Sequence, residues 1–226
     1  PLHLDTNKNV RWKTALPGRG NSTPVVWGQK VFVTQSVEKQ EIRRLVCYNR
    51  ADGSILWTAT VPFKEKELTH DTNPFASSSP VTDGSRVIVW YGSAGLFCYD
   101  MAGKELWRKD LGMQRHIWGY GGSPVLFGNL CILNFGPGER SFLIALDKST
   151  GKTVWQINEP GGHSGEKKPE DKENVWVGSW TTPLLIHEQQ TDALIVSWPG
   201  RVAAYDPVAG REIWTCQGLN PLAYAS

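Results

Sequence analysis

Side chains that could bind a ligand are concentrated in the polar segments between the apolar runs of this 226-residue chain. These segments place imidazole, amide, guanidinium and indole groups close together in the sequence. The candidates for ligand binding are His70, Asn73, Arg115, His116, Trp118 and Trp180. Such a mixture of hydrogen-bonding groups and aromatic faces suits a polar or sugar-like ligand. The alternative interpretation is structural, with histidines that cap turns and tryptophans that fill the gaps between packed sheets.

Metal binding and nucleophilic catalysis have weaker support in the sequence. His70 and His116 precede a Ser-Pro pair by similar distances, but zinc needs at least a third protein ligand, for which His163 is a weak candidate. The chain has no Cys-x-x-Cys pair and no Gly-x-Ser-x-Gly nucleophile motif. The Gly-His-Ser-Gly run at 162–165 lies in a polar, charged segment that is typical of a surface loop, as is the mixed-charge insertion at 166–173. The sequence therefore predicts no metal site and no catalytic residue.

Composition narrows the class of protein further. Charged residues make up 20% of the chain and nearly balance at a net charge of +2, which disfavours a strongly basic nucleic-acid binder. No apolar run approaches the roughly 18–20 residues of a membrane-spanning helix. Cys47 and Cys98 occupy equivalent positions in a repeat where other copies carry alanine, so we expect all four cysteines to be reduced and structural.

A tryptophan that recurs at regular intervals shows how these segments are positioned. The most complete copy of the pattern is Ala-Leu-Asp-Lys-Ser-Thr-Gly-Lys-Thr-Val-Trp at 145–155, and degenerate copies end at other tryptophans. Trp12, Trp57, Trp107, Trp155 and Trp214 are separated by 45, 50, 48 and 59 residues. A self-similar period in this range is the signature of a repeat architecture.

Each repeat contains four short runs rich in β-branched and aromatic residues, separated by Gly, Asn and Asp turns. A Ser/Thr-Pro pair precedes the first run, where a missing N–H costs no ladder hydrogen bond. Four hairpin-linked strands repeated every ~40–50 residues predict an all-β protein, a β-propeller of four-stranded antiparallel blades. We expect blades at about 12–57, 58–107, 108–155 and 156–214, with the start of another at 215–226. The segments 13–22, 59–77, 109–122 and 157–180 would then line one mouth of the central channel.

Four blades leave two apolar faces and unpaired edges at the ends of an arc. We therefore expect the chain to belong to a larger ring of seven or eight blades. It would be either a fragment of a longer propeller or a half-ring that pairs with a second copy. Self-association through exposed blade edges follows from the same reasoning.

The run at 145–155 matches every fixed position of the tryptophan-docking motif Ala-x-Asp-x-x-Thr-Gly-Lys-x-x-Trp, and the chain thereby resembles the PQQ-like, or quinoprotein-like, propeller repeat family over residues 9–226. The resemblance implies that each Trp stacks on the peptide plane of a Gly in the next blade, and that the Asp and Thr fix the intervening turn. The docking residues it implies are Trp57, Trp107, Asp147, Thr150, Gly151, Trp155 and Trp214. We expect these tryptophans to be buried.

The family resemblance implies several functions. The chain is most similar to uncharacterised propellers of planctomycete type and to the non-enzymatic outer-membrane assembly lipoprotein, which implies a non-catalytic scaffold in the periplasm or another extracytoplasmic compartment. Its partner would be a protein or a small polar ligand, and no cofactor is predicted. The alternative is a dehydrogenase that uses pyrroloquinoline quinone and calcium to oxidise an alcohol or sugar. The adjacent cysteine pair of those enzymes is missing here, although the cofactor site could lie partly in other blades. A third possibility is peptide capture along an exposed blade edge.

Overall fold

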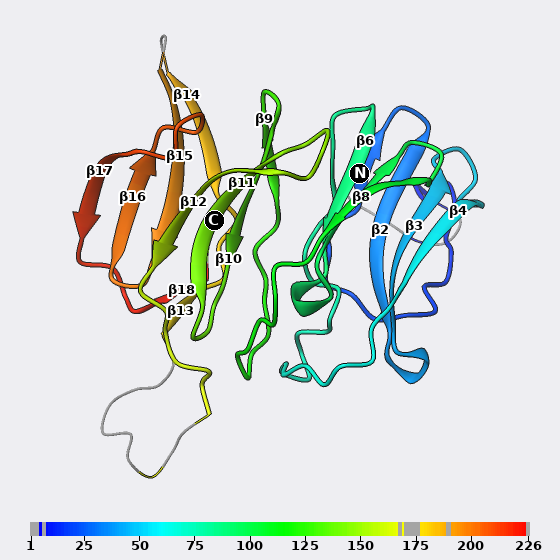
Figure 1. Ribbon diagram of the computed structural model, residues 1–226. Coiled ribbons are helices and arrows are strands. Elements are labelled where there is room, and N and C mark those ends of the chain that lie inside the picture. The colour runs from blue at the N-terminus through cyan, green and yellow to red at the C-terminus, as the bar shows by residue number, and fades with distance from the viewer. Residues whose placement is uncertain (1–4, 6–7, 167–168, 170–176, 189–190, 225–226) are drawn as a thin grey trace.

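The computed structural model describes residues 5, 8–166, 169, 177–188 and 191–224. It consists of four four-stranded antiparallel sheets and one two-stranded parallel sheet (Figure 1). The part of the chain that it describes contains no α-helix, only the two 3₁₀ turns η1 (Glu38–Gln40) and η2 (Gly92–Ala94). The predicted all-β propeller is confirmed.

Each blade is an up-and-down meander in which consecutive strands pair. Blade 1 contains β1 (Val25–Trp27), β2 (Lys30–Val37), β3 (Ile42–Asn49) and β4 (Ile55–Pro62), and blade 2 contains β5 (Val81–Thr82), β6 (Arg86–Trp90), β7 (Leu96–Asp100) and β8 (Glu105–Lys109). Blade 3 contains β9 (Val125–Phe127), β10 (Leu130–Phe135), β11 (Ser141–Asp147) and β12 (Thr153–Glu159), and blade 4 contains β14 (Leu184–Glu188), β15 (Thr191–Trp198), β16 (Arg201–Tyr205) and β17 (Glu212–Gln217). The short strands β13 (Gly178–Ser179) and β18 (Leu222–Ala223) form the parallel sheet.

Blade edges lie further along the chain than the docking tryptophans indicate. β4 continues past Trp57 to Pro62, and β12 continues past Trp155 to Glu159. β17 likewise extends to Gln217, so residues 215–217 complete blade 4. Residues 167–168 and 170–173 of the predicted insertion lie outside the described residues.

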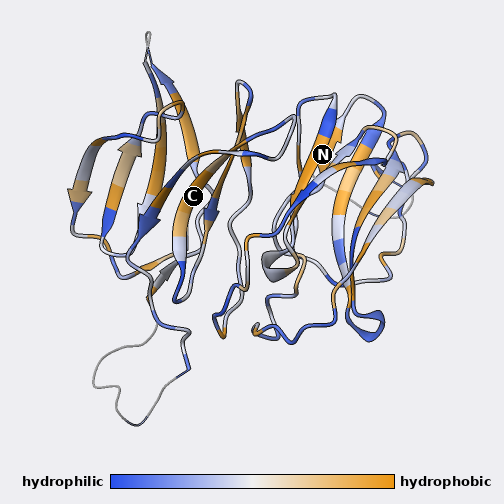
Figure 2. Cartoon of the chain, viewed as in Figure 1, coloured by the Kyte–Doolittle hydropathy of each residue, from blue (hydrophilic) through white to orange (hydrophobic). Residues whose placement is uncertain are grey.

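Near-continuous apolar strands arise because each blade buries both of its faces. In β10, Cys131 and Leu133 pack in a cluster shared with blade 2, whereas the intervening Ile132 packs in a cluster shared with blade 4. A third cluster joins blades 1 and 2. The apolar residues coloured orange in Figure 2 accordingly run along the blade interiors, and the alternation of side chains across a strand divides them between two interfaces.

The inner strands are neighbours in chain order, β1 with β5, β5 with β9 and β9 with β14. In three of the four Ser/Thr-Pro pairs, the hydroxyl links its blade to the one before it. The backbone N–H of Thr23 donates to Ser79 Oγ (2.8 Å), that of Ser79 to Ser123 Oγ (2.9 Å), and that of Ser123 to Thr182 Oγ1 (3.0 Å). The repeated Ser or Thr thus supplies an acceptor that connects consecutive blades around the channel.

Docking of tryptophan on glycine joins the outer parts of the blades. Trp57 lies against Gly103, Trp107 against Gly151 and Trp155 against Gly210. Each indole N–H also donates to a backbone carbonyl of the next blade, as Trp107 does to Lys148 O (2.9 Å). Within the turn, the Asp147 carboxylate accepts hydrogen bonds from the backbone N–H groups of Ser149 and Thr150 and from the Thr150 hydroxyl.

The two ends of the arc differ from each other. Trp12 lies against Gly53 and donates to Arg50 O (2.8 Å), so a residue that precedes blade 1 fills its docking position. Trp214 is 47% exposed, and the expectation that it is buried is wrong for this arrangement because no described glycine packs against its ring. Trp57 and Trp155 are half-buried, and Trp107 is buried.

All four cysteines are free thiols, but only three of them are structural in the sense predicted. Cys47, Cys98 and Cys131 are buried between blades, whereas Cys216 is exposed on the outer strand β17. Burial raises the pKa of Cys47 to about 11 and that of Cys98 to about 12. None of the helical turns in the described residues is long and apolar enough to cross a membrane.

Candidate ligand-binding site

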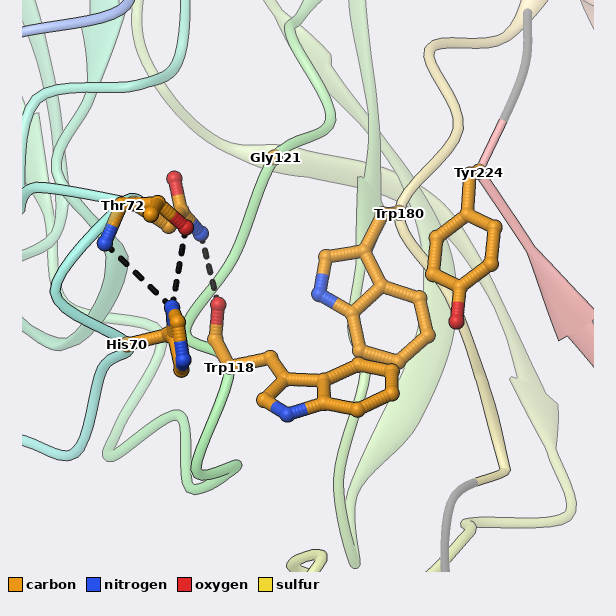
Figure 3. A pocket seen from close by; sticks show the side chains of 7 residues that line it. His70, Thr72, Trp118, Gly121, Trp180 and Tyr224 are labelled. Carbon is orange, nitrogen blue, oxygen red and sulfur yellow. Dashed lines mark hydrogen bonds between the residues drawn. The ribbon is translucent and has the colours of Figure 1, made fainter.

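A pocket opens among the loops that connect successive blades. Its volume is about 540 Å³. It is lined by His70, Thr72, Asn73, Trp118, Gly121, Trp180 and Tyr224 (Figure 3). These residues come from the β4–β5, β8–β9 and β13–β14 connections and from the residue that follows β18. Four of the six sequence-predicted candidates, His70, Asn73, Trp118 and Trp180, therefore meet in one place.

His70 and Thr72 form the polar wall of the pocket. The Thr72 backbone N–H donates to His70 Nδ1 (3.3 Å), and the Thr72 hydroxyl lies 2.9 Å from the same nitrogen. Because Nδ1 is used within the loop, Nε2 is the ring nitrogen that remains for a ligand. Both residues are exposed, and Nε2 has no hydrogen-bond partner among the described residues.

Asn73 holds two loops together. Its Nδ2 group donates to the backbone carbonyls of Trp118 (2.6 Å) and Tyr120 (2.9 Å), and its Oδ1 accepts the Ser77 hydroxyl. The amide is thus occupied within the protein. Asn73 contributes to the pocket mainly by fixing the backbone that carries Trp118.

Three aromatic side chains form the other wall. The ring centroids of Trp180 and Tyr224 are 5.3 Å apart, those of Trp118 and Trp180 5.7 Å, and those of Trp118 and Tyr224 6.2 Å. Their planes differ by 32–39°. Trp180 is 8% exposed and is fixed by its indole N–H, which donates to Gly119 O (3.0 Å). Buried packing and this bond give the wall a rigid base.

Tyr224 and Thr72 were not among the sequence-predicted candidates. Tyr224 reaches the pocket because β18 pairs with β13 and the backbone N–H of Trp180 donates to Ala223 O (2.8 Å). A two-residue parallel pairing between distant segments leaves no periodic signal in the sequence. Thr72 had a local signal, since a hydroxyl two residues after a histidine can hydrogen-bond to its ring.

His116 lies behind the aromatic wall instead of in the pocket. It is fully buried, with its ring edge-on to Trp180 at 4.9 Å and to Trp118 at 5.9 Å. Its Nδ1 accepts the Trp118 backbone N–H (3.1 Å), and its Nε2 has no hydrogen-bond partner among the described residues. Burial lowers the pKa of His116 to about 4, with a smaller contribution from His163. The residue is a neutral support for the two indoles.

Arg115 points to a different part of the surface. It is exposed and lines a separate hollow of about 230 Å³ with Met113, Glu139 and Arg140. The six candidates are therefore divided among the pocket, its support and a neighbouring hollow. Adjacent residues in an irregular loop point in different directions, which the sequence alone does not indicate.

A buried ion pair anchors the β4–β5 loop that carries His70. Arg43 on β3 bonds to Glu67 Oε2 at 3.1 Å, and both side chains are at most 4% exposed. The other Glu67 oxygen accepts the Ser93 backbone N–H (2.8 Å). The Arg43 guanidinium also lies over the rings of Phe63 and Phe75, at 5.3 and 4.4 Å from their centroids. The loop is thus tied to both blade 1 and blade 2.

The donor set of the pocket is unsuited to a metal-bound quinone. A protein calcium site takes six to eight oxygen ligands, several of them usually carboxylates, and none of the described pocket residues is acidic. Nor do the described residues contain a group of three or more His, Cys, Asp or Glu side chains that could hold a metal ion. The aromatic and polar walls instead match a small-molecule site.

Four tryptophan-docked antiparallel blades with a loop-lined pocket define a β-propeller of PQQ-like repeats. The family model described as outer membrane protein assembly factor BamB matches residues 2–61 and 41–217. The chain belongs to this family.

Two relatives of the chain are named for different functions. Tetrathionate hydrolase of Acidithiobacillus ferrooxidans is 25% identical over 167 residues, which are 70% of this chain and 32% of that protein. Outer membrane protein assembly factor BamB of Kangiella koreensis is 24% identical over 150 residues, 63% of this chain and 32% of that protein. The chain spans about a third of the length of these relatives.

Among solved structures, a europium-containing methanol dehydrogenase superimposes with a TM-score of 0.63 at 14% identity, over 88% of this chain and 42% of that chain. At this level of identity the likeness concerns the fold alone. The same blade architecture therefore occurs in an enzyme and in proteins named for outer-membrane assembly.

Proposed function

We propose that this chain is part of a non-catalytic, extracytoplasmic propeller that binds a partner at the loop-lined mouth. The proposal rests on one observation, namely which polar groups of the pocket already have hydrogen-bond partners within the protein. Asn73 is occupied by two backbone carbonyls and a hydroxyl, and Trp180 by Gly119. Only the exposed His70–Thr72 pair and the aromatic wall face a ligand. Thr72 and His70 are within hydrogen-bond distance, but none of the described residues bonds to His70 Nε2 as the third group that would orient the ring as a base.

Membership of the BamB family supports a role in protein interaction. The Kangiella koreensis relative is named as an outer-membrane assembly factor, and a propeller in that role acts by holding other proteins. By this reasoning the partner is a protein, or a small polar ligand held at the same mouth. The family also supports a periplasmic or otherwise extracytoplasmic location. His70, Trp118 and Trp180 are the residues we assign to binding, with Asn73 and His116 as their supports.

The competing function is oxidation with pyrroloquinoline quinone and calcium, as in dehydrogenases of the same fold. A decisive experiment titrates the protein with the quinone plus calcium and then assays alcohol and sugar oxidation with an artificial electron-accepting dye. We expect neither saturable quinone binding nor turnover. Saturable binding together with turnover would show that the protein is an enzyme and overturn the proposal.

Partner binding is tested by photo-crosslinking from the mouth. A photoreactive phenylalanine analogue replaces Trp118 in one variant and Ser149, in an exposed turn between β11 and β12, in the control. We expect a specific crosslinked product, with a partner protein or with a small polar ligand, when the probe is at position 118, and none when it is at position 149. Equal crosslinking from both positions would place the binding surface elsewhere.

A further inference from the structure

The aromatic wall of the pocket is a continuous surface and does not enclose a cage. The ring planes of Trp118, Trp180 and Tyr224 differ by only 32–39°, and each ring contacts the other two at 5.3–6.2 Å between centroids. A cage for a quaternary ammonium needs rings that face one another across the cation. Three rings in mutual contact leave no such space between them. They offer broad apolar area to one flat face of a ligand.

The polar wall offers an imidazole and a hydroxyl. His70 accepts an N–H bond at Nδ1, and the Thr72 hydroxyl lies beside it. The described lining of the pocket contains no Lys, Arg, Asp or Glu side chain. A charged ligand would lose its hydration without a compensating partner. The pocket therefore selects an uncharged ligand that exchanges hydrogen bonds with an imidazole and a hydroxyl.

Main-chain groups around the aromatic wall are already paired. Asn73 occupies the carbonyls of Trp118 and Tyr120, the Trp180 indole occupies the carbonyl of Gly119, and the Trp180 N–H donates to Ala223. An extended peptide obtains much of its affinity from main-chain hydrogen bonds to its receptor. The Trp180 N–H is not available to a peptide, and each of the three carbonyls already accepts one hydrogen bond. A peptide is consequently a poor match to this pocket.

From these three observations we propose that the pocket binds a neutral pyranose sugar unit. One face of a pyranose ring is lined with C–H groups that stack on the aromatic wall, while its hydroxyls reach His70 Nε2 and the Thr72 hydroxyl. The volume of about 540 Å³ lies within the roughly 300–1,000 Å³ range of small-molecule sites and accommodates one or two sugar rings. The proposal rests on the proposed function, because it takes the mouth to be a binding site, and it names the ligand class.

Calorimetric titration tests the proposal with cellobiose as the neutral probe. Glucosamine and glucuronate serve as cationic and anionic comparators, and a proline-rich peptide represents the competing ligand class. The informative variants are Trp118→Leu and Tyr224→Leu, since Tyr224 is 56% exposed and tolerates substitution. Trp214→Leu is the matched control, an indole of 47% exposure on the outer strand of blade 4. Thermal unfolding of each variant verifies that it is folded.

We expect saturable binding of cellobiose, weaker binding of both charged sugars, and a loss of about tenfold in affinity in each pocket variant. Trp214→Leu should leave the affinity unchanged. Absence of saturable cellobiose binding, or binding that neither pocket variant weakens, overturns the proposal. If the peptide binds and both Trp118→Leu and Tyr224→Leu weaken its binding, the sugar proposal is overturned. The proposed function of the mouth as a binding site would remain intact. Oxidation of the sugar in the presence of quinone and calcium would instead refute the non-catalytic function alone.

Discussion

Trp107 lies against Gly151 of the following blade so closely that no side chain fits between them. A Cβ atom on Gly151 would be 2.7 Å from Trp107 Cε3, and the glycine has φ +71°. The same relationship holds between Trp155 and Gly210 and between Trp57 and Gly103. The glycine of the docking motif is thus required for two reasons, a left-handed backbone and direct contact with an indole.

Gly151→Ala is expected to destabilise the protein by about 2–4 kcal/mol, because backbone strain adds to overpacking against Trp107. Gly128→Ala is the matched control in the same blade. Gly128 has φ +52° but nothing within 4 Å of its Cβ position, so it retains only the backbone strain, about 1–2 kcal/mol. Urea denaturation measures the unfolding free energy of both variants. Equal losses of stability would show that the contact with Trp107 contributes nothing.

Trp155→Ala should cost about 3–5 kcal/mol, the usual loss on deleting a packed aromatic side chain. The variant also loses the bond from its indole N–H to Pro207 O (3.2 Å). Trp214→Ala should cost about 1 kcal/mol or less, since its ring is 47% exposed. Trp155 packs on a glycine of the next blade, whereas Trp214 ends a copy of the same motif without such a glycine among the described residues. The difference between the two losses of stability therefore measures the contribution of docking. A large effect at Trp214 in denaturant titrations would mean that another surface covers it in solution.

The repeat was readable from the sequence because docking needs the same residue types at the same spacing in every blade. Loop positions also indicated that His70, Asn73, Trp118 and Trp180 approach one mouth. Three features were not readable. Tyr224 depends on a non-local parallel pairing, Arg115 and His116 diverge in an irregular loop, and the exposure of Trp214 depends on what lies beside blade 4. Each is decided by tertiary packing, which local patterns do not encode.

Glu67→Ala is expected to destabilise the protein by about 3–5 kcal/mol, because it leaves the buried Arg43 guanidinium without its counter-charge. Glu67→Gln keeps an acceptor for the Ser93 N–H and should cost less. Replacing both Arg43 and Glu67 with apolar residues of similar size should cost less than Glu67→Ala alone, since no unpaired charge remains. Chemical denaturation of the three variants ranks their losses of unfolding free energy. A double variant at least as unstable as Glu67→Ala would show that an unpaired buried charge is not the cause of the loss.

His116 makes stability depend on pH in the acidic range. Its pKa is lowered from the ordinary 6.5 to about 4 in the folded protein, so the unfolded chain binds the extra proton first. The contribution of the neutral ring is therefore complete above pH 6.5, declines as the pH falls from 6.5 to 4, and changes no further below 4. The loss amounts to about 3 kcal/mol at most.

The variant that tests this titration is His116→Gln, which removes the ionisable ring from behind the aromatic wall. Its unfolding free energy should vary less between pH 6.5 and 4 than that of the unchanged protein, whatever its absolute stability. His187→Gln is the control, since His187 lies on an exposed strand and bonds to Asp192 (2.6 Å). Denaturant titrations at several pH values give the three slopes. If His116→Gln retains the full pH dependence of the unchanged protein, the acid sensitivity arises from other groups and His116 is already accessible to protons in the native state.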